Sequence, residues 1–64
     1  MTKETLQQIL SGMNKDNFVH EFDNYKVYYS DEYFDIEENG EGIYAEYLTE
    51  SECYEIMCKL LYLD

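Results

Sequence analysis

The chain has 64 residues, of which 45% are hydrophobic and 17% aromatic. This composition allows one folded domain, residues 1–64, and is too apolar for a disordered tail. The net charge is −11, with no arginine and four lysines, which excludes direct binding of nucleic acid or of an anionic membrane surface, since both depend on cations.

Residues 2–12 are predicted to form an amphipathic helix. Thr2 is the expected N-cap, and either Gly12 or Asn14 is the expected end of the helix. Apolar side chains recur at spacings of three and four residues, which places them on one helix face, and these are Leu6, Ile9, Leu10 and Met13. We expect this face to pack against the rest of the domain.

The middle of the chain is dense in β-forming residues and predicts three or four antiparallel strands. The expected strands span residues 18–22, 25–30, 33–38 and 42–48, and a helical turn near Asp16 is the alternative for the first. Asn39-Gly40 is the strongest hairpin signal in the chain. Alternation in the last strand places Ile43, Ala45 and Tyr47 on one face and Tyr44, Glu46 and Leu48 on the other.

A second helix is predicted from Thr49 to about Leu63, with Thr49 and Glu52 forming a capping box. A helix this apolar must be covered on more than one side. The sheet and the first helix can cover it. The alternative cover is a second copy of the chain, which would make a homodimer through Tyr54, Met57, Cys58, Leu61 and Tyr62.

These elements predict an α+β fold: an N-terminal helix, a three- or four-stranded antiparallel meander, and a C-terminal helix packed on one sheet face. Cys53 and Cys58 lie about 140° apart around a helix, so we expect reduced, buried thiols. No cofactor or metal site is predicted. The N-terminus is polar, and no apolar stretch reaches the about 20 residues that span a bilayer. We therefore expect a cytoplasmic protein.

The segment from Glu21 to Glu55 carries twelve carboxylates and only one lysine, Lys26, interleaved with seven tyrosines. Carboxylates two residues apart on a strand stand about 6.6 Å apart on one face, close to the phosphate spacing of a nucleic acid strand. Asp35 and Glu37 form such a pair. The alternative interpretation is a solvated sheet face, but small domains stay in solution with a net charge of magnitude about 2–8.

A short, arginine-free, acidic and tyrosine-rich α+β chain resembles the small inhibitors that phages and mobile elements use against host defence. These include anti-CRISPR proteins, anti-restriction proteins and uracil-DNA glycosylase inhibitors, and the resemblance lies in size and in the composition of residues 21–55. Several members of that class act as DNA mimics. The resemblance therefore implies a non-catalytic inhibitor that occupies the nucleic-acid groove of a basic defence or repair protein in a bacterial host cell.

The resemblance also implies a set of contact residues. Carboxylates would meet lysines and arginines of the target, and these are Asp31, Glu32, Asp35, Glu37, Glu38 and Glu41. Tyrosines would supply flat contacts, and these are Tyr28, Tyr33 and Tyr44.

Three other functions are weighed against this one. The segment 35–46 resembles a calcium-binding EF-hand loop, with Asp35, Gly40 and Glu46 at its first, sixth and twelfth positions. His20 beside Glu21 suggests a general base, but no nucleophile motif accompanies it, and we expect no enzyme activity. The remaining alternative is a small interaction or dimerisation module that uses the apolar C-terminal helix.

Overall fold

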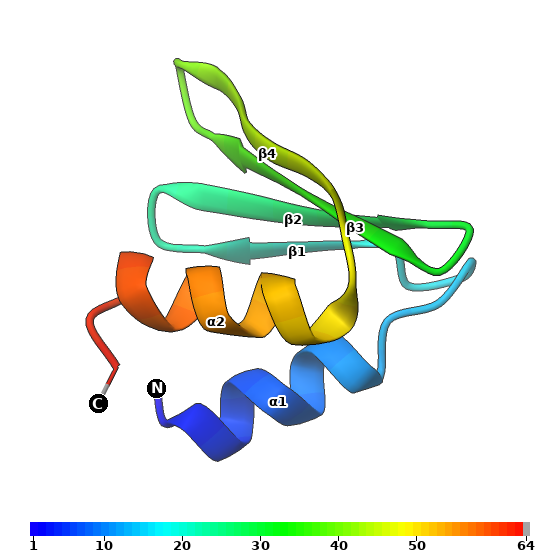
Figure 1. Cartoon of the computed structure of the whole chain (residues 1–64), viewed down its shortest axis with the longest axis horizontal. Helices are drawn as coiled ribbons and strands as arrows, with labels where there is room; N and C mark the ends of the chain where they lie inside the picture. Colours follow the sequence, from blue (N-terminus) through cyan, green and yellow to red (C-terminus); the bar gives the residue numbers. More distant parts are fainter. Residues whose placement is uncertain (64) are drawn as a thin grey trace.

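The computed structural model describes residues 1–63 and shows an α+β fold (Figure 1). The helices are α1 (Lys3–Ser11) and α2 (Glu50–Leu60), and the strands are β1 (Val19–Phe22), β2 (Tyr25–Ser30), β3 (Tyr33–Glu38) and β4 (Gly42–Leu48). The strands form one antiparallel sheet in the order β1-β2-β3-β4. The predicted fold class is confirmed, with four strands in the meander.

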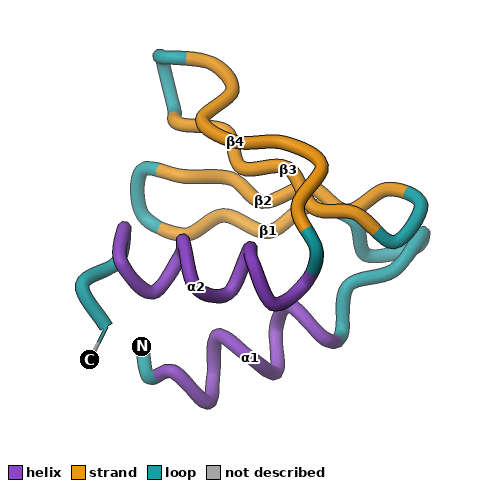
Figure 2. Tube along the Cα trace, viewed as in Figure 1, coloured by secondary structure: helices purple, strands orange, loops and turns teal. Residues whose placement is uncertain are grey.

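Both helices lie on the same side of the sheet (Figures 1 and 2). α2 packs on β3 and β4, and α1 packs against α2. This arrangement covers α2 with the sheet on one side and with α1 on another, as its apolar surface requires. In the part of the chain that the structure describes, no helix covers the opposite face of the sheet.

The hydrophobic core lies between the helices and the sheet. Its buried residues are Leu6, Leu10, Met13, Phe22, Val27, Phe34, Ile36, Cys53, Met57 and Cys58. The predicted apolar face of α1 is confirmed, with Ile9 packed at the edge of this core. Phe34 and Ile36 show why β3 is amphipathic, because they are buried while the residues between and before them are more exposed.

Local hydrogen bonds fix the starts of both helices, as predicted. The side chain of Thr2 accepts a hydrogen bond from the backbone N–H of Thr5 at 3.1 Å. The Thr49 hydroxyl accepts from the N–H of Glu52 at 3.2 Å, and the Glu52 carboxylate accepts from the N–H of Thr49 at 2.9 Å. These bonds satisfy donors that a helix start otherwise leaves unpaired.

α2 ends earlier than predicted. Tyr62 has a φ of 56°, its N–H donates to the carbonyl of Lys59, and the N–H of Leu63 donates to the carbonyl of Cys58. This is the Schellman pattern of hydrogen bonds, which usually has glycine at the left-handed position. No glycine marks this helix end in the sequence, because a tyrosine occupies that position. Within residues 1–63, neither helix is long and apolar enough to cross a membrane.

β4 does not alternate as predicted. Its register against β3 shifts twice, once between Phe34 and Ile36 and once between Ile36 and Glu37. Ala45 therefore lies opposite Ile36 and Leu48 opposite Phe34, so both are on the helix side of the sheet. The prediction that placed them on opposite faces is wrong, because β-bulges insert extra residues and break the period of two.

Candidate functional site

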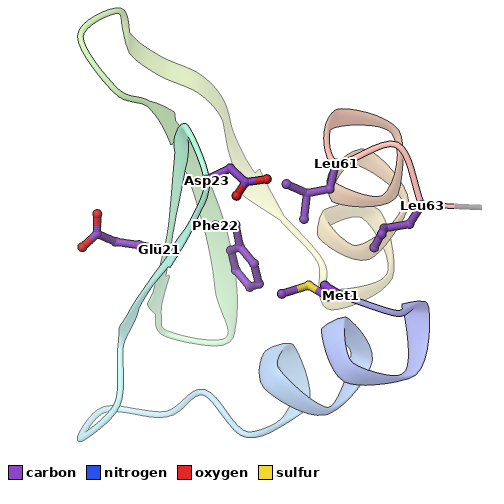
Figure 3. A pocket seen from close by; sticks show the side chains of 6 residues that line it. All are labelled: Met1, Glu21, Phe22, Asp23, Leu61 and Leu63. Carbon is purple, nitrogen blue, oxygen red and sulfur yellow. The ribbon is translucent and has the colours of Figure 1, made fainter.

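The sheet face that turns away from the helices is the candidate contact surface. We call it the outer face and define it by Glu21, Lys26, Tyr28, Tyr33, Asp35 and Glu37, which alternate with core residues along their strands. Figure 3 shows this alternation at β1, where Glu21 points away from the helices and Phe22 points toward Met1. The helices leave this face open to a partner.

Two carboxylates of β3 are held in place on the outer face. The hydroxyl of Tyr28 donates a hydrogen bond to Oε1 of Glu37 at 2.9 Å. The backbone N–H of Tyr47 donates to Oδ1 of Asp35, also at 2.9 Å. Because each bond engages one oxygen of its carboxylate, the orientation of the pair is fixed before a partner binds, which lowers the entropy cost of binding.

The hydrogen bond between Tyr28 and Glu37 also affects the titration of the tyrosine. Hydrogen bonding to Glu37, followed by burial, raises the pKa of Tyr28 above its usual value of 10.0. The hydroxyl therefore keeps its proton at neutral pH and remains the donor to the carboxylate.

One cation interrupts the outer face. Lys26 lies opposite Glu21 on one side and opposite Glu37 on the other in the sheet register. Opposite charges in facing positions of a sheet attract each other, so Lys26 offsets part of the negative charge there. The end of the outer face near Asp35 lies away from this lysine and is the more negative part.

A hollow of about 390 Å³ lies at that end, where β2 turns into β3. We call it the Tyr33–Tyr47 hollow, and it is lined by Ser30, Asp31, Tyr33, Asp35 and Tyr47. The two tyrosine rings meet edge to face, with centroids 6.3 Å apart. Tyr33 is 50% exposed and Tyr47 is 75% exposed. The hollow therefore presents two aromatic rings together with two carboxylates.

The structure does not bring all the predicted contact residues together. Glu38 lies opposite Tyr25, two residues from buried Ile36, and thus on the helix side of the sheet. The ring of Tyr44 also packs edge-on against Tyr25, with centroids 6.2 Å apart. Burial, followed by the charge of Glu38, raises the pKa of Tyr25, in agreement with this placement. Glu38 and Tyr44 are therefore separated from the outer face.

The turns divide the remaining predicted residues. Asp31 and Glu32 form the turn between β2 and β3, next to the hollow, whereas Glu41 lies in the turn at the other end of β3. Sequence reasoning missed Ser30 and Tyr47 as members of this site. Strict alternation could not place Tyr47 beside Tyr33, because that neighbourhood depends on the irregular register of β4.

The predicted homodimer face needs a correction. Met57 is 0% exposed and Cys58 is 9% exposed, so both belong to the core of the chain and offer no surface to a second copy. Tyr54 and Leu61 are half-buried, and Tyr62 is 91% exposed. A homodimer stays a prediction, which now depends on these three residues.

The segment proposed as a calcium loop forms β3, a turn and β4, without the flanking helices of an EF-hand. The turn has a φ of 83° at Gly40, and the N–H of Glu41 donates to the carbonyl of Glu38. Among residues 1–63, no group of three or more histidine, cysteine or acidic side chains is arranged to hold a metal ion. The Asn39-Gly40 signal thus marks a hairpin, as the main prediction had it.

The cysteines and the histidine take part in packing. Cys53 and Cys58 are free and buried, as predicted. Burial, followed by the charge of Glu50, raises the pKa of Cys53 to about 12, so this thiol stays protonated and unreactive at neutral pH. The ring of His20 packs against Phe22, with centroids 4.5 Å apart.

A second hollow lies between β1 and the helices and is shown in Figure 3. Its volume is about 240 Å³, and it is lined by Met1, Glu21, Phe22, Asp23, Leu61 and Leu63. Sites for small molecules usually measure about 300–1,000 Å³. This hollow is smaller, and Phe22, Leu61 and Leu63 belong to the core or pack against it, which favours a packing gap.

A scan of family models and searches of characterised proteins and of solved structures found no match to the chain. Inference about function therefore depends on the outer face and on the Tyr33–Tyr47 hollow.

Proposed function

We propose that the chain is a non-catalytic inhibitor that binds the nucleic-acid groove of a basic defence or repair protein in the bacterial cytoplasm. The observation that carries this proposal is the pair formed by Asp35 and Glu37. Both carboxylates are held by hydrogen bonds on a sheet face that no helix covers within residues 1–63. They lie about 6.6 Å apart along β3, which is close to the spacing of successive phosphates along a nucleic acid strand. A cationic groove that binds such phosphates can therefore bind this pair.

The net charge supports the same partner. At −11 on 64 residues, the chain would be steered toward a basic cleft, and association would be faster at low salt. Exposed tyrosines add contact area at low cost in side-chain entropy. An interface of standard size covers about 800 Å² on each partner. That is about a fifth of the 4437 Å² surface of this chain.

The alternative function is an interaction module that uses α2, and fewer of its proposed contact residues are available to a partner. Its central residues, Met57 and Cys58, are covered by the chain itself. The acidic outer face has no such cover. A charge-dependent interface is therefore favoured over an apolar one.

Three enzyme assays test the proposal: DNA cleavage by a CRISPR effector nuclease, DNA cleavage by a restriction enzyme, and uracil excision by a uracil-DNA glycosylase. We expect inhibition of at least one enzyme, competition with its DNA substrate, and weakening as salt screens the charges. Failure to bind any of the three at low salt would count against the proposal.

Matched charge reversals locate the contact. The outer-face variant Asp35→Lys/Glu37→Lys and the control Asp16→Lys/Glu55→Lys both change the net charge from −11 to −7. The control sites are exposed and lie off the sheet. We expect the outer-face variant to lose inhibition and the control to keep most of it. Equal losses would show that overall charge, and not this face, is what matters.

A further inference from the structure

We propose that the Tyr33–Tyr47 hollow receives one arginine side chain of the partner protein. This inference rests on the proposed function, because a basic partner supplies the arginine. It assigns the chemistry of a single contact, which the proposed function leaves open.

The shape of the hollow suits a planar cation. Its volume, about 390 Å³, lies at the small end of the range of about 300–1,000 Å³ found for ligand sites. Tyr33 and Tyr47 both line it, and their rings are set at 77° to each other. A guanidinium group stacks on an aromatic face better than an ammonium group does, because it is planar and weakly hydrated.

The charges of the hollow favour a cation as well. Asp31 and Asp35 both line it, and no lysine is among its lining residues. The N–H of Tyr47 engages Oδ1 of Asp35, and this bond does not use the second oxygen of that carboxylate. Lys26 lies four residues before Ser30 on an extended strand, about 13 Å away along β2. The fork of an arginine side chain matches carboxylate oxygens in direction as well as in charge.

Peptide binding tests this contact without the natural target. The probes are a short peptide in which arginine alternates with glycine and a second peptide in which lysine replaces arginine. Binding is followed by NMR on isotope-labelled protein at low salt. We expect the arginine peptide to bind several-fold more tightly and to shift the amide signals of Ser30, Asp31, Tyr33 and Tyr47. No binding by either peptide, or equal binding by both, would overturn the inference.

Two tyrosine variants separate the hollow from general charge. Tyr47→Gly removes one of the two aromatic rings of the hollow, and glycine suits the φ of 58° at this position, so the backbone is not strained. The control Tyr44→Leu removes a ring that is 51% exposed and lies on the helix side of the sheet. We expect Tyr47→Gly to abolish the preference for arginine and Tyr44→Leu to preserve it. A preference that survives both Tyr47→Gly and Tyr33→Leu contradicts the inference.

The two proposals can fail separately. If the arginine preference holds but none of the three enzymes is inhibited, the proposed function is wrong and the arginine site stands. If an enzyme is inhibited and Tyr47→Gly inhibits it as strongly as the unaltered protein, the arginine site is wrong and the proposed function stands.

Discussion

The two hairpin turns on either side of β3 both include left-handed backbone positions, but different residues occupy these positions. The turn before β4 places glycine at its left-handed positions, with φ of 83° at Gly40 and 91° at Gly42. A Cβ at either glycine would meet nothing within 4 Å, so these glycines serve conformation and not close packing. The turn before β3 has φ of 50° at Asp31 and 69° at Glu32, where acids occupy the left-handed positions.

This comparison indicates that Asp31 and Glu32 are not the optimal residues for the turn before β3. A left-handed conformation costs about 1–2 kcal/mol for a residue other than glycine, although aspartate tolerates it better than most. Asn-Gly is the preferred pair for a two-residue turn of this kind. The turn before β3 has Asp31 and Glu32 instead, and Asp31 lines the Tyr33–Tyr47 hollow. If the proposed function holds, these acids serve the contact surface at a cost in stability.

The largest effect on stability is expected from the glycine turn. The double variant Gly40→Ala/Gly42→Ala should lower the free energy of unfolding by about 2–4 kcal/mol, because both positions have positive φ. Urea unfolding followed by circular dichroism measures this change. A loss well below about 1 kcal/mol would show that both turns tolerate side chains equally and would remove the contrast between them.

The acidic turn should respond in the opposite direction. Asp31→Asn/Glu32→Gly is expected to raise the free energy of unfolding by about 1–2 kcal/mol, because it relieves the backbone conformation and removes two negative charges. The control Asp31→Asn/Glu32→Gln removes the same charges and keeps a side chain at the second position. The difference between the two variants isolates the backbone contribution, and no difference would mean that charge alone explains the gain.

A smaller gain is expected at the end of α2, where Tyr62 has a φ of 56° and is 91% exposed. Tyr62→Gly should raise the free energy of unfolding by about 0.5–1 kcal/mol, since little contact is lost and the left-handed position suits glycine. The same variant should bind the arginine peptide as the unaltered protein does. Weaker binding would place a contact at α2, away from the outer face.

The loss of stability at alkaline pH should be the same in the unaltered protein and in Asp31→Asn/Glu32→Gly. Burial raises the pKa of Cys53 from 9.0 to about 12 and also raises that of Tyr25. Because these groups hold their protons more tightly in the folded state, their contribution to stability is complete below about pH 9 and is lost as the pH rises toward 12. Urea midpoints of the unaltered protein and of Asp31→Asn/Glu32→Gly should fall in parallel over this range.

Local signals in the sequence predicted most of the fold. The bounds of β2, β3 and β4 match the prediction because turn residues separate them, and the capping box at Thr49 marks the start of α2. The bulges of β4 and the left-handed Tyr62 were not predictable, since no glycine marks the tyrosine position and register depends on packing against a neighbouring strand.

The candidate site was predicted only where strand alternation was enough. Asp35 and Glu37 share the outer face because they lie two residues apart on a regular strand. Glu38, one residue later, falls on the other side for the same reason. Tyr47 lies beside Tyr33 because the register of β4 is bulged, and no pattern in the sequence predicts this bulge.

The most direct test of the central claim measures the affinity of Asp31→Asn/Glu32→Gly for the arginine peptide together with its unfolding midpoint. If the acids serve a cationic partner at the expense of the fold, the variant resists urea better and binds the peptide several-fold more weakly. A variant that is more stable and binds as tightly as the unaltered protein would contradict that role for the acidic turn.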